Sequence, residues 1–125
     1  AMLNAVRQME AIRSIPVGPN QSSNPQQADN LRRMLLAMVE DGLWLENARA
    51  ANRAASAIGD NCADRLVHRV EANEVFVRCS EPERAALRDQ GFDFYDWGAD
   101  AARFVTAWNT RSDDAQGLGQ AIAAL

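Results

Sequence analysis

The hydrophobic pattern at the start of the chain predicts a short helix followed by a linker. Leu3, Val6, Met9 and Ile12 recur at helical spacing, which predicts an N-terminal helix over residues 1–15. Residues 16–30 hold three of the four prolines and are otherwise rich in Asn, Gln and Ser. Such a polar stretch with helix breakers is typical of a linker, so we expect the folded domain to occupy residues 31–125.

A longer helical pattern starts at about Asp29. Apolar residues repeat at helical spacing up to Val39, and a displaced stripe resumes at Trp44 and continues to Ile58. The pattern predicts one long helix that is kinked or broken near Gly42. We expect it to stop at residues 59–61, Gly-Asp-Asn, because glycine tolerates the left-handed conformation that ends helices.

Beyond this helix the pattern alternates between strands and helices. Runs rich in β-branched and aromatic residues predict strands at residues 66–70, 74–79, 92–97 and 102–108. Ser80 and Glu83 form a capping-box pattern for a helix over residues 81–90, which Gly91 should end. A last helix should start near Ser112, with acidic residues in its first turn.

These elements together predict the α+β class. The expected order is a long helix followed by β-β-α-β-β-α, with helices flanking a small, mostly antiparallel sheet.

Charge and composition exclude several functions. The chain has 125 residues and a net charge of -4, which argues against a nucleic-acid backbone or an anionic membrane as the main partner. Its 13 basic residues are all arginine, so the chain offers no lysine for a Schiff base or a phosphate loop. No apolar run reaches the roughly 20 residues that span a bilayer, and no signal pattern precedes residue 30, so we expect a cytoplasmic protein.

The cysteines and the histidine, the residue types that often act in catalysis or metal binding, are not spaced as in a known active site or metal site. Cys62 and Cys79 are expected to be buried thiols, because their spacing fits no metal-binding motif. His68 is the only histidine, and a structural or surface role is expected for it. We therefore predict no catalytic residue, no cofactor-binding residue and no metal site.

Four carboxylates and a glycine pair are also interpreted as structural. The carboxylates are expected to face solvent or cap helices; they are Asp93, Asp96, Asp113 and Asp114. The pair formed by Gly117 and Gly119 lies within the last predicted helix, with no strand before it and no third glycine. It is therefore not a phosphate-binding fingerprint.

Arg103 is the strongest candidate for a binding residue. It lies within a predicted strand rich in apolar residues, where a charge costs free energy unless it meets an anion or reaches water. A guanidinium on a strand can bind a carboxylate bidentately. The residues alone leave an equal alternative, an edge-strand arginine that reaches water or an internal aspartate.

Four ordered segments resemble one enzyme family. They are LAMVEDGLWLENARAAN at 36–52, VEANEVFV at 70–77, GFDFYDWG at 91–98 and RFVTAWNT at 103–110. Together they resemble the C-terminal small domain of the low-specificity L-threonine aldolases, β-eliminating lyases among the fold-type-I pyridoxal phosphate enzymes. The resemblance runs from about residue 31 to residue 125.

The resemblance implies a role for Arg103 and a cofactor for the full enzyme. Arg103 matches the strand arginine that binds the substrate α-carboxylate in this family, and His68 matches none of the family's cofactor-site histidines. The family's cofactor-binding lysine belongs to a large domain that this sequence does not include, and residues 1–30 resemble no part of the family. The chain alone is thus expected to be inactive and to bind no pyridoxal phosphate.

Three functional hypotheses follow. The chain is the excised or truncated small domain of a pyridoxal-phosphate-dependent lyase that cleaves β-hydroxy-α-amino acids to glycine and an aldehyde. Alternatively, it is a stand-alone module derived from that domain that self-associates or binds a partner through the apolar face left uncovered. In the third, it complements a separate large domain in trans. The expected partners are a second copy of the chain or a large cofactor-binding domain.

Overall fold

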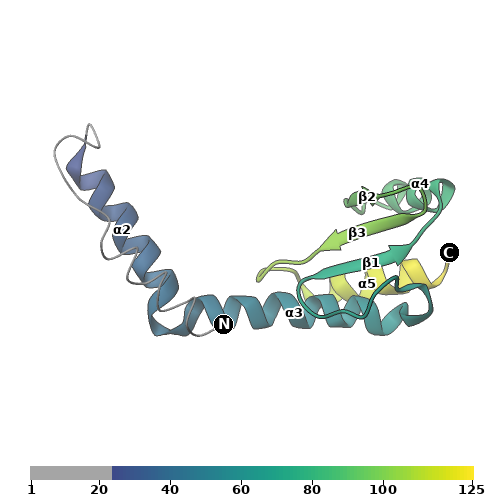
Figure 1. Cartoon of the computed structure of the whole chain (residues 1–125), viewed down its shortest axis with the longest axis horizontal. Helices are drawn as coiled ribbons and strands as arrows, with labels where there is room; N and C mark the ends of the chain where they lie inside the picture. Colours follow the sequence, from purple (N-terminus) through teal and green to yellow (C-terminus); the bar gives the residue numbers. More distant parts are fainter. Residues whose placement is uncertain (1–23) are drawn as a thin grey trace. The chain divides into compact units, whose positions relative to one another are not determined.

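The computed structural model describes residues 24–125 (Figure 1). The helix predicted over residues 1–15 lies outside the described residues. The chain divides into two compact units, residues 1–46 and residues 47–125. Within residues 24–125, no helix is long and apolar enough to cross a membrane.

The described part of the first unit is helical. Helix α2 spans Pro25–Val39, and the side chain of Asn24 caps it by accepting a hydrogen bond from the backbone of Gln26 at 3.0 Å. The helix therefore begins inside the predicted 16–30 linker, because Asn24 and Pro25 supply a cap and a first-turn proline.

The predicted break in the long helix is confirmed. A 3-10 turn, η1 (Glu40–Gly42), separates α2 from α3 (Leu43–Asn61). Asp41 and Gly42 both have positive φ, 60° and 74°. Two successive residues with positive φ cannot continue a right-handed helix, so α2 and α3 are separate helices.

The second unit contains a small antiparallel sheet and two further helices. After the turn η2 (Ala63–Arg65), the order is β1 (Glu74–Arg78), α4 (Glu81–Asp89), β2 (Tyr95–Trp97), β3 (Ala101–Val105) and α5 (Ser112–Ala123). The sheet order is β1-β3-β2, so β3 is central. Phe76 of β1 and Tyr95 of β2 both lie opposite Arg103 of β3. The predicted α+β class is confirmed.

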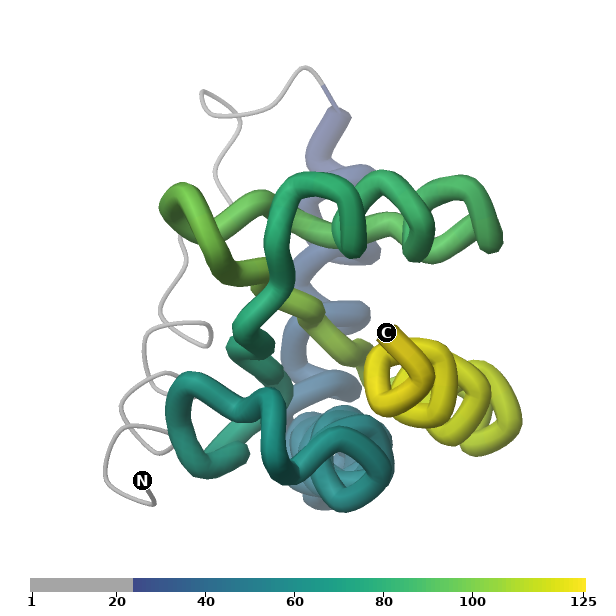
Figure 2. Tube along the Cα trace, turned by 90° about the vertical axis from the view of Figure 1, so that its right-hand side faces the viewer, coloured from purple at the N-terminus to yellow at the C-terminus, as the bar shows by residue number. Residues whose placement is uncertain are grey.

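The core lies between one face of the sheet and the helices. Val75 and Val77 of β1 and Ala102 and Phe104 of β3 are buried in one cluster with residues of α3, α4 and α5, among them Ile58, Leu87 and Ile122. Side chains alternate across a strand, so the residues between them point to the opposite face. Helices α3 and α5 run side by side beneath the sheet in Figure 1 and are seen nearly end-on in Figure 2.

The long helix ends at Asn61, within the predicted stop at residues 59–61, but Gly59 lies inside α3 and does not adopt the left-handed conformation expected of it. Gly59 instead makes room for a neighbour: a Cβ at this position would lie 2.7 Å from Cγ2 of Val70. Its function in the fold is close packing rather than capping.

The strand predicted at residues 66–70 is also wrong. Only a single antiparallel bridge forms there, between Leu66 and Val77, with a hydrogen bond from the amide of Val67 to the carbonyl of Phe76 at 2.8 Å. The chain then leaves the sheet, and Val70 packs against Gly59. The sheet thus has three strands instead of the four expected.

Candidate functional site

Arg103 lies at the centre of the sheet face that points away from the core. Its neighbours on β3, Ala102 and Phe104, belong to the buried cluster, so alternation places the Arg103 side chain on the opposite face. Phe76 and Tyr95 flank it as its partners on β1 and β2. We call this surface the outer face and define it by Glu74, Phe76, Tyr95, Trp97 and Arg103.

The guanidinium of Arg103 has ring contacts but no hydrogen bond among the described residues. Its carbon Cζ lies 4.8 Å from the ring centroid of Tyr95 and 5.5 Å from that of Trp97. The Nε atom is buried and has no hydrogen-bond partner, and it lies 3.9 Å from Oε1 of Glu74. The side chain is 28% exposed, so part of it is accessible to an anion that reaches the outer face.

Aromatic rings continue across the outer face from β2 to the loop before β1. Phe76 meets Trp97 edge-on with 5.2 Å between centroids, and His68 meets Phe76 in the same way at 5.5 Å. A hollow of about 230 Å³ lies at this end of the sheet and is lined by His68, Glu74 and Phe76, together with Arg69, Glu71 and Ala72. His68 is thus an exposed residue that packs on Phe76, as its surface interpretation implied.

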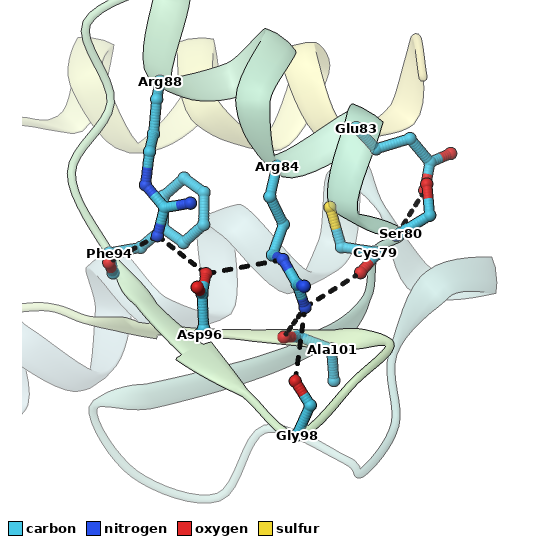
Figure 3. A network of polar contacts seen from close by, with 9 residues as sticks. All are labelled: Cys79, Ser80, Glu83, Arg84, Arg88, Phe94, Asp96, Gly98 and Ala101. Carbon is cyan, nitrogen blue, oxygen red and sulfur yellow. Dashed lines mark hydrogen bonds and ion pairs between the residues drawn. The ribbon is translucent and has the colours of Figure 1, made fainter.

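Two arginines of α4 form a separate cluster with β2 and β3, and its function is structural (Figure 3). Arg84 of α4 is buried, and its Nη1 donates to the carbonyl of Ala101 at 3.0 Å, while its Nε lies 3.4 Å from Oδ1 of Asp96. Arg88 donates to the same carboxylate oxygen at 2.7 Å and lies over the ring of Phe94 at 4.2 Å. These contacts attach α4 to β2 and to the start of β3.

The carboxylate of Asp96 is paired with both Arg84 and Arg88. The hydrogen bond from Arg88 is the main cause that holds the pKa of its carboxyl below the ordinary range. A carboxylate that is stabilised in its charged form is a weak general acid. Asp96 therefore links β2 to α4, consistent with its structural interpretation.

The other candidates from the sequence do not converge on a site. Cys62 and Cys79 are free and buried, and burial raises the pKa of both thiols, so they are poor nucleophiles. Asp93, Asp113 and Asp114 are exposed. Within residues 24–125, no group of three or more His, Cys, Asp or Glu side chains is arranged to bind a metal.

The glycine pair of α5 has a packing function. A Cβ on Gly119 would lie 2.7 Å from Cβ of Asn61 and 2.9 Å from the carbonyl oxygen of Ile58, whereas a Cβ on Gly117 would meet nothing within 4 Å. Gly119 therefore allows α5 to approach α3 closely.

Sequence reasoning singled out Arg103 as a candidate but did not predict its surroundings. The rings of Tyr95 and Trp97 reach it from β2, and the only signal for that contact was the aromatic composition of the 91–98 segment. Arg84 was missed altogether, because nothing in its local sequence indicates that it is buried.

Comparisons with known proteins give a consistent set of relatives. No protein-family model matches the chain. A low specificity L-threonine aldolase from a Pseudomonas species is 38% identical over 95 residues, covering 72% of this chain and 28% of the relative. The protein of the same name from Pseudomonas aeruginosa is 37% identical over 92 residues, covering 70% of this chain and 27% of the relative.

The fold comparison agrees. A solved structure of Leishmania major threonine aldolase superposes with a TM-score of 0.62 at 19% identity, covering 81% of this chain and 35% of that one. At this identity the superposition is evidence for the fold alone. The chain spans little more than a quarter of the length of the two Pseudomonas relatives.

Proposed function

Because this chain is related to the low specificity L-threonine aldolases over most of its length, we propose that it forms the C-terminal small domain of such a lyase. In the full enzyme, a β-hydroxy-α-amino acid would be cleaved between Cα and Cβ to give glycine and an aldehyde. The contribution of this chain is to bind the α-carboxylate of the substrate through Arg103.

The lack of hydrogen bonds to the Arg103 guanidinium is the observation that supports this role. Its donors make no hydrogen bond within the described residues, although Nε is buried. The side chain is 28% exposed, so a carboxylate at the outer face could supply hydrogen bonds to the guanidinium that the fold itself does not provide. The planar fork of arginine matches a carboxylate bidentately, and its place on the central strand fixes where the ligand would lie.

The chain does not supply an anchor for pyridoxal phosphate, the cofactor that the family resemblance implies. The cofactor is held in such enzymes as a Schiff base with a lysine, and all 13 basic residues of this chain are arginine. We therefore assign no cofactor-binding residue to this chain and propose that residues outside this sequence provide the lysine. On its own, the chain is expected to be catalytically inactive.

Carboxylate binding by the chain tests the role of Arg103. A 15N-labelled sample is titrated with L-threonine, and with acetate as the simplest carboxylate, while the signals of Arg103 and its neighbours on β2 are followed. Arg103→Gln, which keeps a polar side chain without the charge, should weaken binding roughly tenfold or more. Arg111→Gln, on the exposed N-cap of α5, is the matched control and should bind like the wild type. Equal affinities for wild type and Arg103→Gln would contradict the assignment.

Inactivity is tested separately. The chain is incubated with pyridoxal phosphate and L-allo-threonine, and glycine is measured against a protein-free control. No glycine above the control is expected. Glycine formation that depends on the chain would contradict the proposal that it is inactive on its own.

A second candidate function is a self-associating or partner-binding module. Helix α2 favours it, because it has no buried residue and exposes Leu31, Met34 and Met38. An exposed apolar helix face is a common interaction surface. Light scattering distinguishes this candidate: a chain that is monomeric both whole and without residues 2–28, and stays soluble, would count against self-association.

A further inference from the structure

We propose that Tyr95 and Trp97 are positioning residues that hold the guanidinium of Arg103 in the orientation a carboxylate requires. This inference rests on the proposed function, since it concerns how the same binding residue is oriented. Neither ring is assigned a contact with the ligand.

The sheet register brings both rings to the arginine. Tyr95 lies directly opposite Arg103, and Trp97 lies opposite Ala101, two positions further along. Residues two apart on a strand share a face, so both side chains stand beside the arginine side chain on the outer face. The resulting distances from Cζ to the ring centroids, 4.8 Å and 5.5 Å, are within the range of cation–π contacts.

Apart from the two rings, the described residues offer the guanidinium only a long ion pair with Glu74 and no hydrogen bond. A hydrogen-bonded partner would hold the fork in one plane, but Nε has none, and Oε1 of Glu74 stays 3.9 Å away. An arginine side chain has several rotatable bonds, and a bidentate ligand can bind only the orientations in which the fork faces it. The two rings are therefore the contacts that limit these orientations.

Trp97 is itself held in place by its neighbours. Phe76 packs edge-on against it at 5.2 Å, and His68 packs on Phe76 at 5.5 Å. The row of rings links the loop before β1 to the edge strand β2. Tyr95 is 62% exposed and has no ring–ring contact among the described residues, so Trp97 is expected to be the more rigid of the two contacts.

Arginine side-chain NMR on the 125-residue chain tests the inference without a ligand. The Nε–H signal of Arg103 is identified by its absence from Arg103→Gln. Trp97→Ala and Tyr95→Ala should each lower its order parameter and remove part of its ring-current shift. Trp97→Phe and Tyr95→Phe, which keep a ring, should retain most of both. Trp108→Ala removes another exposed tryptophan, whose ring does not contact Arg103, and as the control it should change neither.

Acetate binding completes the test. Each alanine variant should weaken acetate binding about two- to fivefold, as expected for a lost exposed cation–π contact, and the ring-keeping variants should recover it. The inference is overturned if Arg103 stays as ordered in the alanine variants as in the wild type, or if its order falls while acetate affinity is unchanged. If wild type does not bind acetate, the proposed function of Arg103 fails, whereas the order parameters still decide whether the rings hold the guanidinium.

Discussion

Asn73 and Thr106 exchange two hydrogen bonds across the sheet. The Asn73 side chain donates from Nδ2 to the carbonyl of Thr106 at 2.9 Å, and the Thr106 amide donates to the carbonyl of Asn73, also at 2.9 Å. The pair lies one position beyond the Glu74–Val105 pair of the β1–β3 ladder. Oγ1 of Thr106 also donates to the carbonyl of Ala51 on α3 at 2.7 Å. The strand that carries Arg103 is thus attached to α3 at its end.

Removing the Thr106 hydroxyl should destabilise the fold. Thr106 is buried, and Thr106→Val keeps its shape while leaving the Ala51 carbonyl without this donor. We expect a loss of about 1–2 kcal/mol in the free energy of unfolding, measured by urea denaturation. Thr106→Ser should recover part of it. Ser56→Ala, which removes an exposed hydroxyl from α3, should stay within about 0.5 kcal/mol of wild type. If Thr106→Val unfolded at the same urea concentration as the wild type, the hydrogen bond to Ala51 would contribute nothing to stability.

Two glycines of α5 should respond to alanine in opposite directions. Gly119→Ala places a Cβ 2.9 Å from the Ile58 carbonyl oxygen and 2.7 Å from Asn61 Cβ, so α5 must shift away from α3. The expected cost is about 1–3 kcal/mol of stability. Gly117→Ala meets nothing within 4 Å and should gain up to about 1 kcal/mol from helix propensity. Thermal unfolding of both variants checks the pair, and similar shifts in melting temperature would refute the close packing of α5 on α3.

The sequence pattern was sufficient for elements that local chemistry determines. The break at Gly42, the capping box of Ser80 with Glu83 and the end of α4 before Gly91 depend on a few adjacent residues, and all three were predicted correctly. The strand predicted at 66–70 does not form, because the chain leaves the sheet after the Leu66–Val77 bridge and Val70 packs against Gly59. That contact joins a helix to the loop that follows it, which periodicity does not encode.

On the outer face, too, the sequence indicates local features but not the contacts between strands. Arg103 stood out because a charge in an apolar strand is locally unusual. Its contacts with Tyr95 and Trp97 depend on the register between β2 and β3, which only the folded sheet fixes. The carboxylate-binding role of Arg103 remains a prediction that rests on the family resemblance and on its free donors.

The capping box of α4 should make stability depend on pH. The amide and the hydroxyl of Ser80 donate to Oε2 of Glu83 at 2.8 Å and 2.9 Å, and the bond from the backbone is the main cause that lowers the pKa of Glu83. Because the folded pKa lies below the unfolded value of about 4.3, the stabilisation is complete above that value. It is lost as the pH falls through the folded pKa.

Urea unfolding between neutral pH and about pH 3 measures this contribution. Wild type should be more stable than Glu83→Gln at neutral pH, and the gap should shrink towards acid as Glu83 becomes protonated. Glu81→Gln, in the same first turn, is the matched control and should follow the wild-type curve. A gap between wild type and Glu83→Gln that stays constant with pH would contradict the prediction.

Glu74 should weaken the binding of simple carboxylates to the outer face. Its Oε1 lies 3.9 Å from Nε of Arg103, so its negative charge partly neutralises the guanidinium and repels a second carboxylate. Glu74→Gln keeps the size and removes the charge, and acetate should bind about two- to fivefold more tightly to this variant at low salt. The gain should diminish as salt screens the interaction.

Glu71→Gln is the matched control, because Glu71 pairs with Arg69 at 3.0 Å in an exposed ion pair. Its acetate affinity, followed by NMR titration, should equal that of wild type. Tighter binding in both variants would indicate a general charge effect, and weaker binding in Glu74→Gln would mean that Glu74 orients Arg103 instead of competing with the ligand.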